Sequence, residues 1–190
     1  LSRDPAVRVA AAQGLVRSSA PVRRPAFVGR TNVLAEIDRE LDELERGAHG
    51  VVVLEGGSGI GKSTLLGEIR ERATRRGVTV LAGRAAEREH VPFNVLDGVA
   101  DGLASLAEAS PWIEALGSAF PALRSSAGHA LATSADALAD AFRAALSALG
   151  PTVLLLDDVQ WADHDCERLL AATLAPPAPP SVLVVIARRP

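Results

Sequence analysis

A glycine-rich segment at residues 56–63, with the sequence GGSGIGKS, constrains the fold of this 190-residue chain more than any other feature. The apolar run at residues 51–54 comes shortly before it and is typical of a short strand that is buried on both faces. A segment of helical character follows and extends to about Arg76. The segment matches the pattern G-x-x-x-x-G-K-[ST] in full, in the strand-turn-helix context that this pattern requires. The sequence therefore predicts a loop that binds the phosphate groups of a nucleotide.

Each residue type in this loop has a physical role in binding phosphate. Glycines lack a Cβ and let the chain reach positive φ, so that consecutive backbone N–H groups converge on the phosphate oxygens. The helix that begins near Gly61 directs the positive end of its dipole at the same oxygens. Lys62 adds a positive charge for the β- and γ-phosphates, as a candidate catalytic residue, and Ser63 offers a hydroxyl oxygen to Mg²⁺. The predicted nucleotide-binding residues are Gly57, Ser58, Gly59, Ile60, Gly61, Lys62, Ser63 and Thr64.

Two aspartates follow another apolar run, in a position that suits a metal ion. Residues 153–156 are Val-Leu-Leu-Leu, and Asp157 and Asp158 come directly after them. Open α/β sheets bind ligands at the carboxyl ends of their strands, where Mg²⁺ at a phosphate-binding loop finds its second anchor. We expect Asp157 to hold Mg²⁺ through water, and Asp158 to orient or deprotonate the attacking water as a catalytic residue. The alternative is that both aspartates only cap a turn or a helix.

Apolar runs and helical segments alternate along the rest of the chain. Strands are predicted at residues 51–54, 78–81, 152–156 and 182–187, and helices at 33–44, 61–76, 93–107, 112–118, 135–149 and 165–174. Such alternation predicts the α/β class, with a mostly parallel sheet and helices on both of its faces. We expect a nucleotide-binding core over residues 26–190, preceded by a connector or a loosely docked helix at residues 1–25. We predict no catalytic role for the helical stretch at residues 91–149.

Composition argues against several other kinds of function. The net charge of −3 leaves no concentrated basic surface, so we expect no direct binding of nucleic acid. No apolar run approaches the roughly 18 residues of a transmembrane helix, so we expect no membrane partner. The single cysteine, Cys166, excludes an internal disulfide and indicates a small buried side chain in a reducing, cytoplasmic setting. Because methionine is missing even at position 1, we expect the chain to be a segment of a longer protein.

Four motifs together carry a resemblance to a known family. They are FVGR at residues 27–30, GGSGIGKS at 56–63, LLLDDVQWAD at 154–163 and VVIAR at 184–188. With these motifs the chain resembles the STAND class of P-loop ATPases, and within it the ATPase domain of large LuxR-type bacterial transcriptional regulators. The resemblance covers about residues 26–190. Many ATPases share the glycine-rich loop and the aspartates, whereas their combination with FVGR and DDVQWAD is more specific.

The resemblance implies roles for two further groups of residues. Val28, Gly29 and Arg30 would lie near the adenine and ribose of ATP. Arg188 would read the γ-phosphate as a sensor and is a third candidate catalytic residue. An arginine at the edge of a sheet is physically suited to this task, because it responds to a charge that is lost on hydrolysis.

The resemblance also implies an arrangement of the parent protein. The strand that begins near Val182 would lie between the strand before the glycine-rich loop and the strand that ends at Asp157. A further strand, a helical lid and a winged-helix domain would follow beyond Pro190 as downstream domains of the same chain. ATP and Mg²⁺ would be the ligands, and nucleotide-dependent self-association would be one behaviour of the parent protein.

Three functions are compatible with these observations. The first is a signalling ATPase that hydrolyses ATP slowly and acts as a switch for the downstream domains. The second is a metabolic phosphotransferase, which requires an acceptor pocket that no motif marks and to which residues 87–90 could contribute. The third is a nucleotide-binding module in which Asp158 is idle. The preference for ATP over GTP comes from the resemblance alone, and the sequence contains no N-K-x-D motif that would read guanine.

Overall fold

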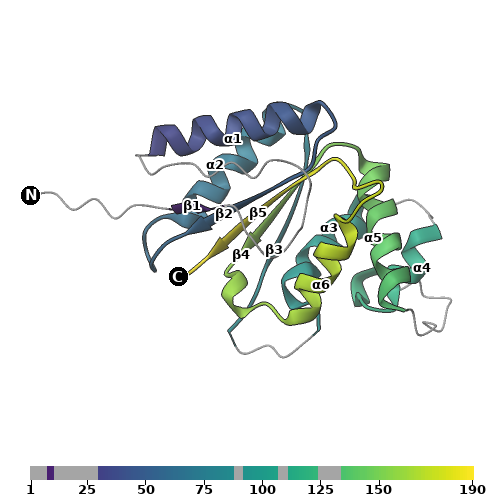
Figure 1. The fold of residues 1–190 in the computed structure, drawn as a ribbon. Helices are drawn as coiled ribbons and strands as arrows, with labels where there is room; N and C mark the ends of the chain where they lie inside the picture. The colour runs from purple at the N-terminus through teal and green to yellow at the C-terminus, as the bar shows by residue number, and fades with distance from the viewer. Residues whose placement is uncertain (1–7, 11–29, 88–91, 107–110, 124–133) are drawn as a thin grey trace, which may run out of the picture.

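A sheet that lies between two layers of helices forms the centre of the molecule (Figure 1). The computed structural model describes residues 8–10, 30–87, 92–106, 111–123 and 134–190. Its strands are β1 (Arg8–Ala10), β2 (Gly50–Glu55), β3 (Thr79–Arg84), β4 (Thr152–Asp157) and β5 (Val182–Arg188). The predicted α/β class, with a mostly parallel sheet and helices on both faces, is therefore confirmed.

The order of the strands is β1-β2-β5-β4-β3. All pairs among β2, β5, β4 and β3 are parallel, so the chain crosses over between neighbouring strands through helices. β5 lies between β2, which precedes the glycine-rich loop, and β4, which ends at Asp157. This is the strand order that the family resemblance implied, and it is confirmed.

β1 is a strand that the sequence analysis did not predict. It pairs antiparallel with the outer edge of β2, with Val9 opposite Leu54. The expectation of a connector or a helix is therefore wrong for residues 8–10, and the rest of residues 1–25 lies outside the described residues. An open sheet edge offers unpaired backbone N–H and C=O groups to any extended segment. That attraction depends on the tertiary structure and leaves no periodic pattern in the sequence.

The helices form one layer on each face of the sheet (Figure 1). One layer consists of α1 (Arg30–Glu45) and α2 (Lys62–Arg75). The other layer consists of α3 (Asp97–Leu106), α5 (Ala135–Leu149) and α6 (His164–Thr173), with α4 (Pro111–Gly117) packed against α5. Three short 3₁₀ helices complete the described elements, η1 (Asn94–Leu96), η2 (Pro121–Leu123) and η3 (Val159–Trp161).

β4 illustrates how the sheet divides the interior into two cores. Val153 and Leu155 pack in the core with α1 and α2, whereas Leu154 and Leu156 pack in the core with α3, α5 and α6. None of these four side chains is more than 3% exposed. Because successive side chains of a strand point to opposite faces, a strand that is buried on both faces is apolar at every position. This explains the continuous apolar runs in the sequence.

α3 packs directly against the backbone of β3. A Cβ on Gly83 would lie 1.7 Å from the backbone oxygen of Val95, and a Cβ on Gly98 would lie 2.6 Å from that of Ala82. Only glycine fits at both positions, which lets the helix approach the strand closely. β3 continues through Gly83 to Arg84, beyond the predicted end at residue 81, where it stays paired with β4.

The helical stretch predicted at residues 91–149 is helical in its described parts and builds most of the second layer. Its aromatic side chains meet in the core, where the rings of Phe93 and Phe120 have centroids 5.5 Å apart and those of Phe120 and Phe142 are 6.5 Å apart. None of the helices in the described ranges combines the length and the apolar character that crossing a membrane requires.

The parallel strands bring four chain segments to one edge of the sheet. In the register of β2 and β5, Glu55 lies opposite Arg188. In the register of β3 and β4, Arg84 lies opposite Asp157. The carboxyl ends of all four strands therefore meet at the edge where the glycine-rich loop begins, and this edge is where α/β sheets bind ligands.

Candidate functional site

The glycine-rich loop connects β2 to α2 at the carboxyl edge of the sheet. Gly59 and Gly61 have φ of 75° and 93°, in the left-handed region that favours glycine. Gly61 is the N-cap of α2 and has no side chain to accept hydrogen bonds from the first turn. Backbone N–H groups at the start of a helix have no partner within the helix, so those of α2 are available to an anion.

Lys62 crosses back over this loop and is only 8% exposed. Its Nζ donates hydrogen bonds to the backbone oxygens of Gly56, at 2.7 Å, and Gly57, at 2.8 Å. A buried ammonium group needs such partners because burial of an unpaired charge is costly. The contacts hold the charge of Lys62 at the loop, as the predicted phosphate-binding role requires.

Ser63 and Asp157 meet across the sheet although they are 94 residues apart in sequence. The hydroxyl of Ser63 donates a hydrogen bond of 2.9 Å to Oδ2 of Asp157, and Oδ1 of Asp157 accepts a 2.9 Å bond from the backbone N–H of Asp158. The hydroxyl and carboxylate oxygens are the kind of hard ligand that Mg²⁺ prefers. The two residues predicted to hold the metal therefore form one site with suitable chemistry.

Asp158 has a strained backbone and a side chain that is held on both sides. Its φ is 53°, which is unusual for a residue with a Cβ. Oδ2 accepts hydrogen bonds from Nε and Nη2 of Arg84, at 3.0 and 2.7 Å. Oδ1 accepts a 3.0 Å bond from Nε2 of Gln160. Partial burial of Asp158 raises the pKa of its carboxyl, but the bonds from Arg84 and Gln160 outweigh burial, and the pKa is lowered. Asp158 is therefore a carboxylate at neutral pH.

Arg84 contacts the site but was not predicted from the sequence. Arg84 ends β3 one strand away from Asp158, and its pKa is raised by its hydrogen bond and charge interaction with that carboxylate. The signal that could have found it is its position, because a charged residue that ends a parallel strand lies at the same edge as the aspartates. Finding it would have required the pairing of β3 with β4.

Arg188 lies beside the strand that leads into the loop. Its Nη2 is 3.4 Å from Oε1 of Glu55, and its backbone oxygen accepts a 3.3 Å hydrogen bond from the N–H of Gly56. The structure thus places the predicted sensor arginine next to the first residues of the loop, with its side chain paired to Glu55. Glu55 is a second residue that the sequence analysis did not consider.

The segment predicted to contact adenine is only partly described. Val28 and Gly29 lie outside the described residues, and Arg30 is the first residue of α1. Residues 88–90, which were considered for an acceptor pocket, also lie outside the described residues.

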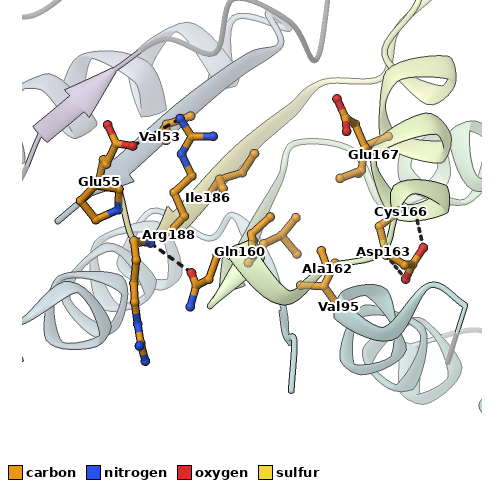
Figure 2. A pocket seen from close by; sticks show the side chains of 15 residues that line it. Val53, Glu55, Val95, Gln160, Ala162, Asp163, Cys166, Glu167, Ile186 and Arg188 are labelled. Carbon is orange, nitrogen blue, oxygen red and sulfur yellow. Dashed lines mark hydrogen bonds and ion pairs between the residues drawn. The ribbon is translucent and has the colours of Figure 1, made fainter. Parts of the chain in front are cut away.

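A cavity of about 600 Å³ lies beside the site, on the face of the sheet that α6 covers. Figure 2 shows Glu55 and Arg188 on one side of it, residues of α6 on the other, and Gln160 between them. Val53 and Ile186 contribute apolar side chains to its floor.

Asp163 joins the loop after β4 to α6 and η1. Its carboxylate caps α6 by accepting a 2.9 Å hydrogen bond from the N–H of Cys166, and it accepts a 3.1 Å bond from the N–H of Asn94. Burial alone raises the pKa of Asp163, but these hydrogen bonds outweigh burial, and the pKa is lowered. The thiol of Cys166 is 1% exposed and burial raises its pKa to about 12, so Cys166 is the packing residue predicted from the sequence.

Residues 26–186 match the family model of the AAA ATPase domain. Comparison with curated proteins and comparison with solved structures gave no match. The match includes the glycine-rich loop, both aspartates and β5 up to Ile186. Such a domain binds nucleotide, typically ATP with Mg²⁺, in agreement with the geometry at the carboxyl edge.

Proposed function

The chain belongs to the AAA ATPase domain family, and from this premise we propose that it hydrolyses ATP slowly as a switch within a larger signalling protein. The observation that carries the proposal is the meeting of Ser63 and Asp157 directly beside Lys62. These residues come from two strand-end segments that are distant in sequence, and they carry the hydroxyl, the carboxylate and the ammonium that a magnesium–triphosphate complex requires.

In the proposed reaction, the residues at the carboxyl edge of the sheet have different roles. The N–H groups of the loop and the ammonium of Lys62 bind the β- and γ-phosphates. The hydroxyl of Ser63 and the carboxylate of Asp157 would hold Mg²⁺, the latter through water, and Mg²⁺ would supply positive charge that offsets the charge of the phosphates. Asp158 orients the attacking water, and Arg188 responds to the loss of the γ-phosphate.

The finer identity that we propose is a STAND-class ATPase domain of the large LuxR type. The FVGR and DDVQWAD motifs and the position of β5 between β2 and β4 support it. Its partners would be ATP and the downstream domains of the parent chain, and nucleic acid would be bound elsewhere in that chain. Val28, Gly29 and Arg30 would contact adenine and ribose, which makes ATP the expected nucleotide.

Substitution of Lys62 by alanine tests the proposed binding site. We expect MgATP to raise the midpoint of thermal unfolding of the parent chain, and Lys62→Ala to remove most of this shift because the phosphates lose their cation. Thermal unfolding with and without MgATP measures the effect. Arg46→Ala is a matched control, since Arg46 makes an exposed ion pair with Glu43 before β2 begins.

Equal shifts in the parent and the Lys62→Ala variant would show that nucleotide binds elsewhere. Release of phosphate from ATP without any acceptor separates the switch from a phosphotransferase. Release that depended on an added small acceptor would contradict the proposed hydrolysis.

A further inference from the structure

Gln160 is the central residue of η3, and both ends of its amide are engaged. Its Nε2 donates a 3.0 Å hydrogen bond to Oδ1 of Asp158. Its Oε1 accepts a 3.1 Å bond from the backbone N–H of Arg189, which is the dashed line at Gln160 in Figure 2. A carboxylate only accepts and a backbone N–H only donates, so the chemistry of its neighbours fixes the orientation of the amide. Gln160 therefore bridges the loop after β4 and the end of β5.

The backbone conformation of Asp158, whose side chain Gln160 contacts, is unfavourable for a residue with a Cβ. A residue with a Cβ rarely adopts a positive φ, and this conformation persists only where its surroundings hold it. Arg84 also holds Asp158, but its side chain is 71% exposed, so solvent and salt screen this interaction. Gln160 is half-buried and lies in the same loop as Asp158. Its hydrogen bond fixes the position of Oδ1 of Asp158.

The end of β5 is tied to the glycine-rich loop on its other side. The backbone oxygen of Arg188 accepts a hydrogen bond from the N–H of Gly56, and the guanidinium of Arg188 is 3.4 Å from the carboxylate of Glu55. Arg189, the next residue, is the partner of Gln160. The side chain of Gln160 thus connects this strand end directly to the carboxylate of Asp158.

We propose that Gln160 is a positioning residue for hydrolysis. Its two hydrogen bonds hold the carboxylate of Asp158 at a fixed place relative to the end of β5. The inference rests on the proposed ATPase function and on the role of Asp158 in that function. Gln160 acts through Asp158. Its contribution therefore concerns turnover and leaves nucleotide binding, which depends on Lys62, Ser63 and Asp157, nearly unchanged.

Two substitutions of Gln160 test this role in the complete parent chain. Gln160→Glu keeps an acceptor for the N–H of Arg189 but loses the donor and sets a second carboxylate against Asp158. Gln160→Met keeps the approximate length of the side chain and removes both hydrogen bonds. We expect kcat for MgATP to fall roughly 10- to 100-fold in both variants, as for other small misplacements of a reacting group. We expect KM and the MgATP-induced thermal shift to stay within about threefold and about 2 °C of the parent.

A double-substitution series distinguishes positioning from a general loss of structure. If Gln160 acts through Asp158, Gln160→Met lowers the residual turnover of Asp158→Asn by less than about twofold, because the two effects are not additive. Arg46→Ala is the control. It removes an exposed ion pair with Glu43 at the C-terminal end of α1 and should leave kcat and KM unchanged.

The possible results separate the two proposals. If the protein without substitutions hydrolyses ATP and both Gln160 variants have the same kcat, the positioning role is overturned and the proposed function stays intact. A parallel loss of nucleotide binding and thermal stability in both variants would overturn it as well, in favour of a structural role. Absence of phosphate release from the parent would overturn the proposed function, and the inference with it.

Discussion

At the scale of single residues, the contacts of Asp158 refine its predicted chemistry. Hydrogen bonds from Arg84 and Gln160 lower the pKa of its carboxyl in spite of partial burial. A carboxylate with a lowered pKa is a weaker base. In the proposed hydrolysis we therefore expect Asp158 to orient the attacking water rather than to take up its proton.

Asp163 gives a prediction about pH at the same scale. Its pKa is lowered in the folded chain from the ordinary value of 3.8, because hydrogen bonds from Cys166 and Asn94 outweigh burial. The ionised form therefore stabilises the fold above about pH 4, and this contribution is lost as the pH falls through the folded-state pKa. We expect Asp163→Asn, which keeps a cap for α6 but has no charge, to reduce stability at pH 7 by about 0.5–1 kcal/mol.

Denaturant unfolding between pH 3 and pH 7 measures this effect. The difference in the free energy of unfolding between the parent and Asp163→Asn should shrink toward low pH. A difference that stays constant across this range would show that the charge of Asp163 contributes nothing to stability.

At the scale of elements, the packing of α3 on β3 depends on glycine. A Cβ on Gly83 would lie 1.7 Å from a backbone oxygen of Val95, and backbone atoms cannot rotate away as a flexible side chain would. We expect Gly83→Ala to lower the free energy of unfolding by about 1–3 kcal/mol or more, because η1 and α3 must shift outward. Denaturant titration of the purified variant is the measurement.

Gly67→Ala on α2 is the matched control for this substitution. A Cβ at Gly67 would meet no heavy atom within 4 Å. Alanine is the better helix former by roughly 1 kcal/mol, so this variant should be as stable as the parent or more stable. Equal destabilisation by both substitutions would contradict the explanation from close packing.

At the scale of the whole molecule, the parallel sheet makes the site by bringing strand ends together. Ser63 follows β2, and Asp157 ends β4, with β5 between the two strands. Because Ser63 and Asp157 would hold the metal while the loop holds the phosphates, we expect ATP and Mg²⁺ to stabilise the fold cooperatively. At 100-fold excess over Kd, MgATP should add about 2.7 kcal/mol to the free energy of unfolding.

Removal of the metal tests this expectation. Thermal unfolding with ATP and EDTA should show a clearly smaller shift than unfolding with ATP and Mg²⁺, and Mg²⁺ alone should have little effect. Equal shifts with and without EDTA would contradict a shared site for metal and nucleotide.

The sequence by itself determined those parts of the site that consist of consecutive residues. The loop at residues 56–63 requires its glycines, lysine and serine at set spacing, because one short turn must surround the phosphates. The apolar runs likewise predicted β2, β4 and β5, because strands buried on both faces consist mostly of apolar residues. Ser63 and Asp157 were each predicted as ligands of the same Mg²⁺, so their proximity could be anticipated from the sequence.

Only the tertiary structure decided which partners these residues have. Arg84 reaches Asp158 across 74 residues of sequence, and Gln160 reaches Arg189 across 29. Their contacts depend on which strands are neighbours and on the register in which they pair. Neither property can be read from the apolar pattern of a single strand. β1 was unpredicted for the same reason, because its three residues gain their hydrogen bonds from an edge of β2 that exists only after the sheet has formed.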